Sequence, residues 1–303
     1  MMKELAKKIL RGAICLVLVC VLAFLVLFFR HLPGYLILKE PVSIAPPEDG
    51  GIRIMSCNVR CLTVLDLGKK SWFYRADKLL GDIEEESPGI VGFQEVTRWQ
   101  YDYLVDTMSG YDSVITYRDN SIISEGCPVF YNTALYTLVD KGSFWLSETP
   151  EVMSRDWDSA CYRICSYVIL TDNASQKDFV VFNTHLDHVS DEARINGIGV
   201  VLDKIAQFGD LPAVIMGDLN AEEGSATYLS VTENFLDACY ETENTTNAGT
   251  FQWWGELESG RRIDYFMISK TGFNVHRYCV ADIVHDGTYA SDHNPIVLDI
   301  TLE

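Results

Sequence analysis

The sequence predicts an α/β domain, with a sheet core and helices outside it, attached to an N-terminal membrane helix. Two observations predict this arrangement. After residue 51, short apolar runs rich in β-branched residues alternate with segments whose apolar residues recur at helical spacing. Before residue 31, an uncharged run is long enough to cross a bilayer. With 48% hydrophobic and 22% charged residues the chain is globular, and its 303 residues fit one large domain or two ordinary ones.

The run from Gly12 to Phe29 has no charged residue and is mostly Leu, Val, Ile, Phe and Ala. As a helix it would cover about 27 Å at roughly 1.5 Å per residue. Four basic residues precede it and only Arg30 and His31 follow, so the positive-inside rule places the rest of the chain outside the cytoplasm. The alternatives are a cleaved signal peptide, although no small-residue cleavage site follows the run, and a buried helix, which would need a partner on every face.

These signals divide the chain into three parts. We predict a basic cytoplasmic tail and single transmembrane anchor over residues 1–31, and a proline-punctuated linker over residues 32–50. Residues 51–303 then form the folded domain, which we place on the extracytoplasmic side of the cell membrane.

Within the domain, periodicity and turn residues predict each element in order. Residues 52–58 alternate as a strand, and residues 71–86 carry apolar positions at helical spacing until Pro88-Gly89. Ser190 begins a second long helix, with acidic residues in its first turn, which Gly209 ends. The remaining patterns predict a short helix at 227–233 and strands at 89–95, 114–117, 128–132, 134–139, 143–146, 162–171, 178–184, 213–216, 262–269, 276–283 and 294–302.

The charge of the chain is strongly negative and uneven. The formal net charge is −19; of the 24 basic and 43 acidic residues, five and one lie at or before His31, which leaves 19 and 42 behind it, a net of −23. A body this acidic has no broad attraction for a nucleic-acid backbone and suits bound divalent cations or a small substrate better. A nuclease whose metals supply local positive charge is still compatible with this composition.

The nine cysteines do not follow the ligand spacing of a zinc site. Cys57 and Cys61, and likewise Cys161 and Cys165, are four residues apart. Either pair could form a disulfide in an exported domain, and the alternative for both is buried free thiols.

Polar residues of one chemical kind stand at the ends of apolar runs. After the run 213–216, Asp218 and Asn220 lie two residues apart, so in extended chain they face the same side. Unpaired carboxylates at such places would be costly, which favours their convergence on shared cations, and oxygen donors suit Mg²⁺ or Mn²⁺ rather than zinc. The full set is Asn58, Glu95, His185, Asp218, Asn220, Asp264, Asp292 and His293.

In this order the motifs resemble the endonuclease/exonuclease/phosphatase superfamily of DNase I-like folds, from about residue 51 to the C-terminus. The most specific are Thr184-His185-Leu186, Gly217-Asp218-Leu219-Asn220 and Ser291-Asp292-His293. The resemblance implies a four-layered sandwich, two mixed sheets face to face with helices outside. Residues 142–150 and Arg163 look like a membrane-anchored bacterial branch of that superfamily.

The resemblance also implies a role for each residue. Asn58, Glu95 and Asp292 would bind Mg²⁺ or Mn²⁺, with Glu95 as the main ligand. His185 would contact the scissile phosphate, and Asp218 with Asn220 would position the attacking water and a phosphoryl oxygen. Asp264 would orient His293, and either His293 or Asp218 fits the part of the base. These eight assignments are Asn58, Glu95 and Asp292 as metal ligands and His185, Asp218, Asn220, Asp264 and His293 as catalytic residues.

Together these patterns predict that residues 51–303 are the catalytic domain of a membrane-anchored, divalent-metal-dependent phosphoester hydrolase. The acidic body favours a small-molecule, lipid or sugar phosphate substrate. An anchored nuclease acting on DNA or RNA is the alternative enzyme, and a non-catalytic binding module on the same fold is the alternative of another class. Three further interpretations stay open: Arg163 as a phosphate contact or an ion pair, His188 as a solvated loop residue, and Trp253-Trp254 as cleft lining or core.

Overall fold

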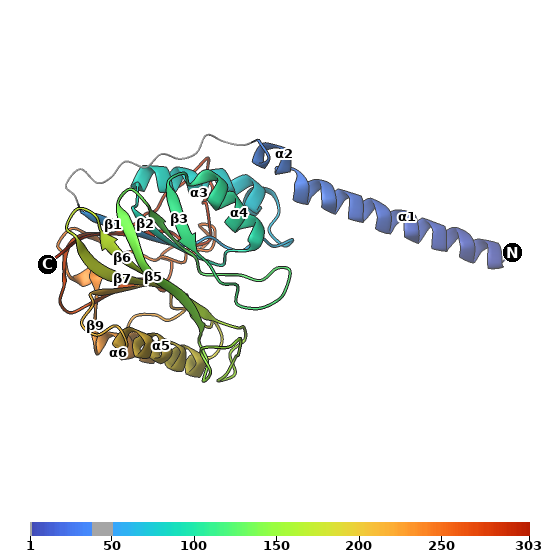
Figure 1. Cartoon of the computed structure of the whole chain (residues 1–303). Coiled ribbons are helices and arrows are strands. Elements are labelled where there is room, and N and C mark those ends of the chain that lie inside the picture. Colours follow the sequence, from blue (N-terminus) through green and yellow to red (C-terminus); the bar gives the residue numbers. More distant parts are fainter. Residues whose placement is uncertain (1, 38–50) are drawn as a thin grey trace.

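The structure, a computed structural model, describes residues 2–37 and 51–303. Two mixed β-sheets pack face to face, and helices cover their outer surfaces, while one long helix projects away from the domain (Figure 1). The predicted four-layered sandwich is therefore confirmed. Most of the predicted linker, residues 38–50, lies outside the described residues.

The first sheet has seven strands in the order β10-β12-β13-β1-β2-β4-β3. The central strands β1 and β2 are parallel, and β1 pairs antiparallel with β13 on its other side. Helices α3 (Trp72–Glu86) and α4 (Arg98–Thr107) pack against the outer face of this sheet through a cluster of aliphatic and aromatic side chains. The strands are β1 (Ile52–Asn58), β2 (Ile90–Gln94), β3 (Tyr111–Val114), β4 (Val129–Asn132), β10 (Thr245–Thr246), β12 (Phe273–Val280) and β13 (Ile296–Leu302).

The second sheet has six strands in the order β5-β6-β7-β8-β11-β9, with β7 and β8 parallel. Helices α5 (Asp191–Ala206) and α6 (Ala226–Thr232) cover its outer face. Between the two sheets lies a core of aliphatic and aromatic side chains that includes Ile54, Val181 and Phe266, each fully buried. The strands are β5 (Tyr136–Trp145), β6 (Ile164–Asp172), β7 (Lys177–His185), β8 (Ala213–Asp218), β9 (Phe235–Asp237) and β11 (Asp264–Ser269).

Four strands deliver functional side chains to one edge of the sandwich. Asn58 ends β1, Glu95 follows β2 directly, and His185 and Asp218 end the parallel pair β7 and β8, where the two residues lie opposite each other. At the end of β8 the backbone passes very close to β7. Gly217 has φ +136°, and a Cβ there would stand 1.9 Å from the carbonyl oxygen of Thr184, so only glycine fits.

Several predicted elements are wrong in detail. The two strands predicted at 134–139 and 143–146 form one strand, β5, because the polar residues between them lie on an exposed sheet edge with a bulge after Leu138 rather than in a turn. The strand predicted at 114–117 corresponds to β3 (Tyr111–Val114), which ends at the residue where the predicted strand begins. Helix α4 was missed because its many aromatic residues favour strands, although Thr97 and Gln100 form a capping box that marks its start.

The cysteines are free thiols throughout the part of the chain that the structure describes, which includes all nine. Cys57 and Cys165 are buried in the sheets and Cys61 and Cys161 line the cavity described below, so of the two alternatives left open for these pairs the structure has the free thiols. Among the described residues, one helix is long and apolar enough to cross a membrane, α1 (Met2–Phe29), whose most apolar window has a mean hydropathy of 3.2.

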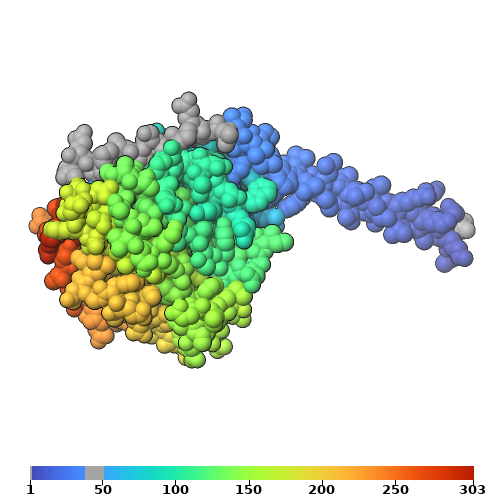
Figure 2. All heavy atoms as spheres, viewed as in Figure 1, coloured from blue at the N-terminus to red at the C-terminus, as the bar shows by residue number. Residues whose placement is uncertain are grey.

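The C-terminal end of helix α1 packs against the folded domain. Phe28 is only 7% exposed, and its ring meets that of Phe73 on α3 edge to face at 5.7 Å. A single further turn, α2 (Leu32–Tyr35), packs beside it: the ring of Tyr35 stacks on Tyr103, and its hydroxyl donates to the carbonyl oxygen of Trp99. These contacts fix the end of α1 against the outer helices of the first sheet, and the rest of α1 projects from the domain (Figure 2).

Candidate active site

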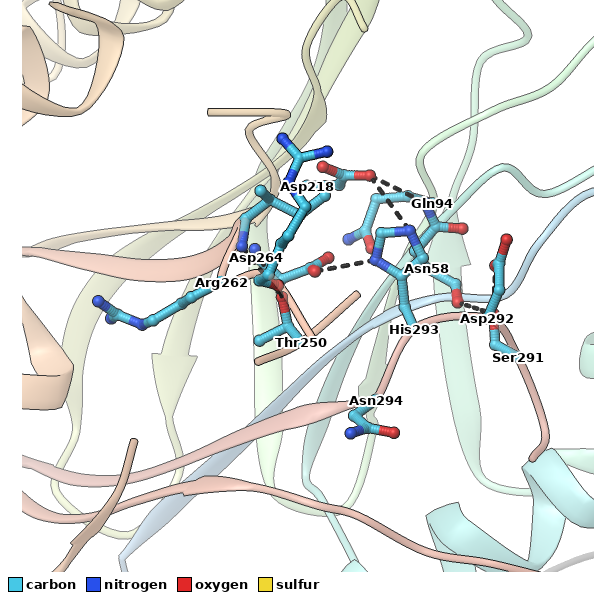
Figure 3. Close-up of polar contacts among 12 residues, drawn as sticks. Asn58, Gln94, Asp218, Thr250, Arg262, Asp264, Ser291, Asp292, His293 and Asn294 are labelled. Atoms are coloured by element: carbon cyan, nitrogen blue, oxygen red, sulfur yellow. Dashed lines mark hydrogen bonds and ion pairs between the residues drawn. The ribbon is translucent and has the colours of Figure 1, made fainter. Parts of the chain in front are cut away.

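The predicted residues surround one cavity at the strand-end edge of the sandwich, with a volume of about 330 Å³. Glu95, His185, Asp218, Asn220, Asp292 and His293 line it. Asn58 and Asp264 stand behind this lining and hold its members through hydrogen bonds (Figure 3). The sequence therefore placed all eight residues in one site, although they come from segments far apart in the chain.

Asp218 is the most firmly held of the acids. One of its oxygens accepts from the backbone N–H of Asn220 at 2.8 Å, and the other accepts from the side-chain amide of Asn58 at 3.0 Å. The same amide donates to Glu95 at 3.1 Å, so Asn58 connects two carboxylates from different sheets. Its own oxygen accepts from the backbone N–H of Arg60 at 3.0 Å.

His293 is oriented by Asp264, as predicted. Its Nδ1 lies 2.9 Å from Asp264 Oδ2, while Nε2 faces Asp218 Oδ2 at 3.8 Å (Figure 3). Among the described contacts, the ring of His293 is the one side chain that bonds to the Asp264 carboxylate. The backbone N–H of Asp264 donates to the hydroxyl of Thr250. The arrangement fixes the ring and leaves Nε2 for the cavity.

His185 and Asn220 form a second polar pair across the parallel strands. The Asn220 amide lies 3.0 Å from His185 Nε2 and also donates to the carbonyl oxygen of Leu186. Asn220 adopts φ +48° and Glu95 φ +63°, left-handed conformations that cost energy in residues with a side chain. Two predicted site residues therefore sit on strained backbone immediately after a strand, which turns their side chains into the cavity.

Burial and neighbouring charges shift the ionisation of the site. Burial, and then the nearby Asp264, raises the pKa of Asp218 to about 7. For His293, burial alone would lower the pKa, but Asp264, Asp218 and Asp292 raise it to about 10. Burial and the approach of Arg163 hold the pKa of His185 well below its ordinary range, so this imidazole is neutral.

The two proposed metal-binding acids respond in opposite directions. Burial alone would raise the pKa of Glu95, yet the backbone N–H of Cys61 and the charge of Arg60 bring it below its usual value. Burial raises the pKa of Asp292, and the proximity of Glu95 raises it further. The two carboxylates therefore repel each other across the same small volume, an arrangement that a bound cation would relieve.

The opposite wall of the cavity contains residues that the sequence did not single out. Arg118 pairs with Glu125 at 2.7 Å, and burial, followed by the charge of Glu95, raises the pKa of Glu125 to about 7. Both lie on the loop between β3 and β4, where no motif marks them. Arg163, left open between two roles, is only 6% exposed, lies 3.6 Å from Asp187 and donates to the ring of His188. Its Nε has no hydrogen-bond partner.

A buried polar network lies directly beneath the site and joins the sheets. The Gln94 amide donates to Asn183 at 2.7 Å and to Ser56 at 3.1 Å, and Asn183 donates in turn to the carbonyl oxygens of Phe93 and Pro128. Gln94 immediately precedes Glu95, and Asn183 precedes Thr184-His185. The sequence shows amide side chains inside apolar runs, and such buried amides need hydrogen-bond partners. It does not show which residues those partners are.

The tryptophan pair divides between two environments. Trp253 lines the cavity with its ring beside Phe251, whereas Trp254 lies away from it under the side chains of Arg75 and Lys70. His188 is exposed at the cavity rim, in agreement with a loop position, but it contacts Arg163.

A family model of the endonuclease/exonuclease/phosphatase family matches residues 55–293. The chain belongs to this family. Every residue discussed above from Asn58 to His293 lies inside the matched segment. The family is one of phosphoester-acting hydrolases and is generally dependent on divalent metals.

Solved structures of the family resemble the chain over most of its length. An endonuclease/exonuclease/phosphatase from Bacteroides vulgatus is 31% identical, with a TM-score of 0.79, over 84% of this chain and 99% of that one. A mannosyl-6-phosphatase from Bacteroides thetaiotaomicron is 28% identical, with a TM-score of 0.74, over 82% and 99%. Among relatives found by sequence, an uncharacterized protein of Acanthamoeba polyphaga mimivirus is 26% identical over 75% of this chain and 91% of its own length.

Proposed function

We propose that the protein is a membrane-anchored, divalent-metal-dependent phosphoester hydrolase whose catalytic domain lies outside the cytoplasm. The observation that carries the proposal is the convergence of eight residues from six segments on one cavity of about 330 Å³. The similarity to a phosphatase of sugar phosphates supports a small phosphoester as the substrate. The anchor rests on α1 and on the basic residues before its apolar run.

The donors in the cavity fit a hard divalent cation. Glu95 and Asp292 both present carboxylates to the cavity, the charge of Glu95 raises the pKa of Asp292, and oxygen ligands are those that Mg²⁺ and Mn²⁺ prefer. Asn58 would join them by turning its amide oxygen toward the ion. Asp218, Asp264 and His293 also lie close enough together to hold a metal, but the hydrogen bond between Asp264 and His293 already occupies two of those atoms.

When bound, the cation supplies positive charge to non-bridging phosphate oxygens and to the leaving oxygen. The side chains of this protein supply the rest. Asp264 holds His293 so that Nε2 faces the cavity, and Asn58 with the Asn220 backbone holds Asp218 beside it. Neutral His185, which the Asn220 amide holds, lies beside Asp218 at the phosphoryl group. The neighbouring carboxylates keep His293 protonated, so its ring stabilises negative charge on the phosphoryl group, and Asp218 accepts the proton of the attacking water.

The charge of the domain separates this proposal from an anchored nuclease. Residues behind His31 carry a net charge of −23, which repels a polyanion, whereas a small phosphoester is bound through the cavity alone. Substrates with one or two phosphate groups are therefore favoured over DNA or RNA.

The test uses the full chain in phosphatidylcholine nanodiscs with Mg²⁺ or Mn²⁺. Release of inorganic phosphate is measured from a panel of sugar phosphates and other small monoesters, with plasmid and RNA degradation measured in parallel. Hydrolysis of small phosphoesters that His293→Ala abolishes is the expected result. Degradation of plasmid alone would favour the nuclease, and inactivity with every substrate and both metals would favour a binding module.

A further inference from the structure

The edge of the sandwich that holds the cavity is the edge from which α1 leaves the domain. Strand β1 runs toward this side and ends there at Asn58, and α1 projects from the same side (Figure 1). The start of α4 lies between the two features. Glu95 comes three residues before Arg98, the first residue of α4, and the carbonyl oxygen of Trp99 accepts from Tyr35 of α2. The packing of Phe28 on Phe73 keeps α1 in this position.

Two loops that line the cavity also carry exposed aliphatic pairs. The loop after β1 contributes Arg60 and Cys61 to the cavity and then exposes Val64 by 53% and Leu65 by 82%. The loop between β3 and β4 contributes Arg118 and Glu125 and exposes Ile122 by 93% and Ile123 by 74%. Figure 1 shows this second loop, in green, reaching the side of the domain from which α1 projects. Solvated aliphatic pairs of this size at adjacent positions are unfavourable in water.

Both loops are fastened to the start of α4, beside the root of α1. The backbone N–H of Leu62 donates to Gln100 at 3.0 Å, and the guanidinium of Arg98 lies 4.6 Å above the ring of Tyr117. Trp99 stands between them and is 54% exposed. The same turn of helix therefore positions the anchor and both apolar tips.

Adjacent pairs of exposed large apolar residues occur at this end of the domain and nowhere else in residues 51–303. A third pair, Val152 and Met153, lies on the loop after β5. Trp145 at the end of β5 pairs with Ile164, which is level with the site end of β7, so this loop also leaves from the site edge. The single exposed residue Val139 lies in β5, away from the end of this strand that reaches the site edge.

We propose that this edge is seated on the lipid bilayer, with Val64-Leu65 and Ile122-Ile123 inserted at the interface, so that the cavity takes phosphoester groups at the membrane surface. The occupant is a bilayer rather than a protein because a candidate membrane span emerges beside the tips, and the turn α2 that follows it is bound through Tyr35 to α4, the helix that holds them. The acidic body gives anionic lipids no attraction, so the contact is apolar and forms on phosphatidylcholine. The part of this inference that concerns substrate rests on the proposed function.

The contact itself is tested without any activity. The full chain is reconstituted in phosphatidylcholine nanodiscs with and without brominated acyl chains, and tryptophan quenching is compared among wild type, Ile122→Trp and Val139→Trp. The expected result is that the additional fluorescence of Ile122→Trp is quenched by at least about half, insensitively to salt, and that of Val139→Trp is not. Equal quenching in the two variants would overturn the inference.

The effect on substrate is tested with the same nanodiscs. Phosphatidic acid in the disc and soluble p-nitrophenyl phosphate are offered to wild type, to the double variant Ile122→Ser/Ile123→Ser and to the control Val139→Ser. The double variant should lose at least about fivefold in turnover of the lipid and keep turnover of the soluble ester, while the control keeps both. Unchanged lipid turnover in the double variant would overturn membrane presentation. If wild type hydrolyses neither ester, the proposed function fails, and the quenching result alone decides the membrane contact.

Discussion

The two walls of the cavity are built differently. The wall of Glu95, Asp218 and His293 lies at or near strand ends, and Asn58 and Asp264 behind it hold these three side chains by hydrogen bonds of about 3 Å. The wall of Arg118, Glu125 and Arg163 belongs largely to loops, and buried guanidinium nitrogens of both arginines have no hydrogen-bond partner. A satisfied, rigid wall suits a reaction step, whereas unpartnered donors suit a ligand.

The comparison assigns chemistry to the strand wall and substrate affinity to the loop wall. This division also places specificity where the fold tolerates change, because loops vary without disturbing the sheets. Substitutions in each wall test this assignment.

The largest effect is expected on the strand wall. His293→Ala and Asp218→Asn should each lower kcat by about 10²–10⁴-fold, because a positioned acid or base contributes on that scale. Steady-state hydrolysis of the best substrate from the panel measures this, and His276→Ala, a histidine far from the cavity, is the matched control. Near-normal turnover with the fold intact would remove the altered residue from the mechanism.

A smaller effect, on stability, is expected at Asp187 beneath the loop wall. Burial alone would raise the pKa of Asp187, but the backbone N–H groups of Ser190, Val189 and Ala160, with Arg163, hold it well below its usual value. A depressed folded-state pKa stabilises the fold above the unfolded value of about 4, and this stabilisation is lost as pH falls toward the folded value.

Asp187→Asn should therefore lower the free energy of unfolding by about 2 kcal/mol at pH 7, with the difference from wild type shrinking below about pH 4. Urea unfolding of the full chain in nanodiscs between pH 3 and 7 measures it, with the exposed Asp210→Asn as control. A difference that does not change with pH would show that the charge of Asp187 is not the cause.

The smallest effect is expected at Arg163. Arg163→Met should raise KM about tenfold and leave kcat within about threefold, because the variant loses a charge-assisted contact to the substrate phosphate. Arg155→Met, an exposed arginine, is the control. A fall in kcat with unchanged KM would show that Arg163 acts in the chemical step and not in substrate binding.

The same division explains what the sequence could predict. Asn58, Glu95 and Asp218 lie at or directly after the ends of apolar strands and His293 lies just before one, and a polar residue at either end of a buried run is visible without a structure. Arg118 and Glu125 lie in a loop whose path no periodicity fixes, so only the fold shows that they face Glu95. The network of Gln94 and Asn183 was missed for a related reason, since its two members meet only when the sheets pack.

The edge of the sandwich from which α1 leaves was likewise only partly predictable from the sequence. The apolar run before Phe29 was evident in the sequence, but the packing of Phe28 on Phe73 and the place of Ile122-Ile123 beside it depend on tertiary structure. Helix α4, which contacts both α2 and the loop of Ile122-Ile123, was overlooked because aromatic composition outweighed the capping box at its start.

The claim that the strand wall holds the divalent cation is tested most directly by calorimetric titration of Mn²⁺ into the full chain and into Glu95→Gln. Glu95→Gln keeps the shape of the side chain and removes its charge, so the account predicts saturable binding to wild type that weakens at least about tenfold in the variant. Equal Mn²⁺ affinity in the two proteins would contradict it.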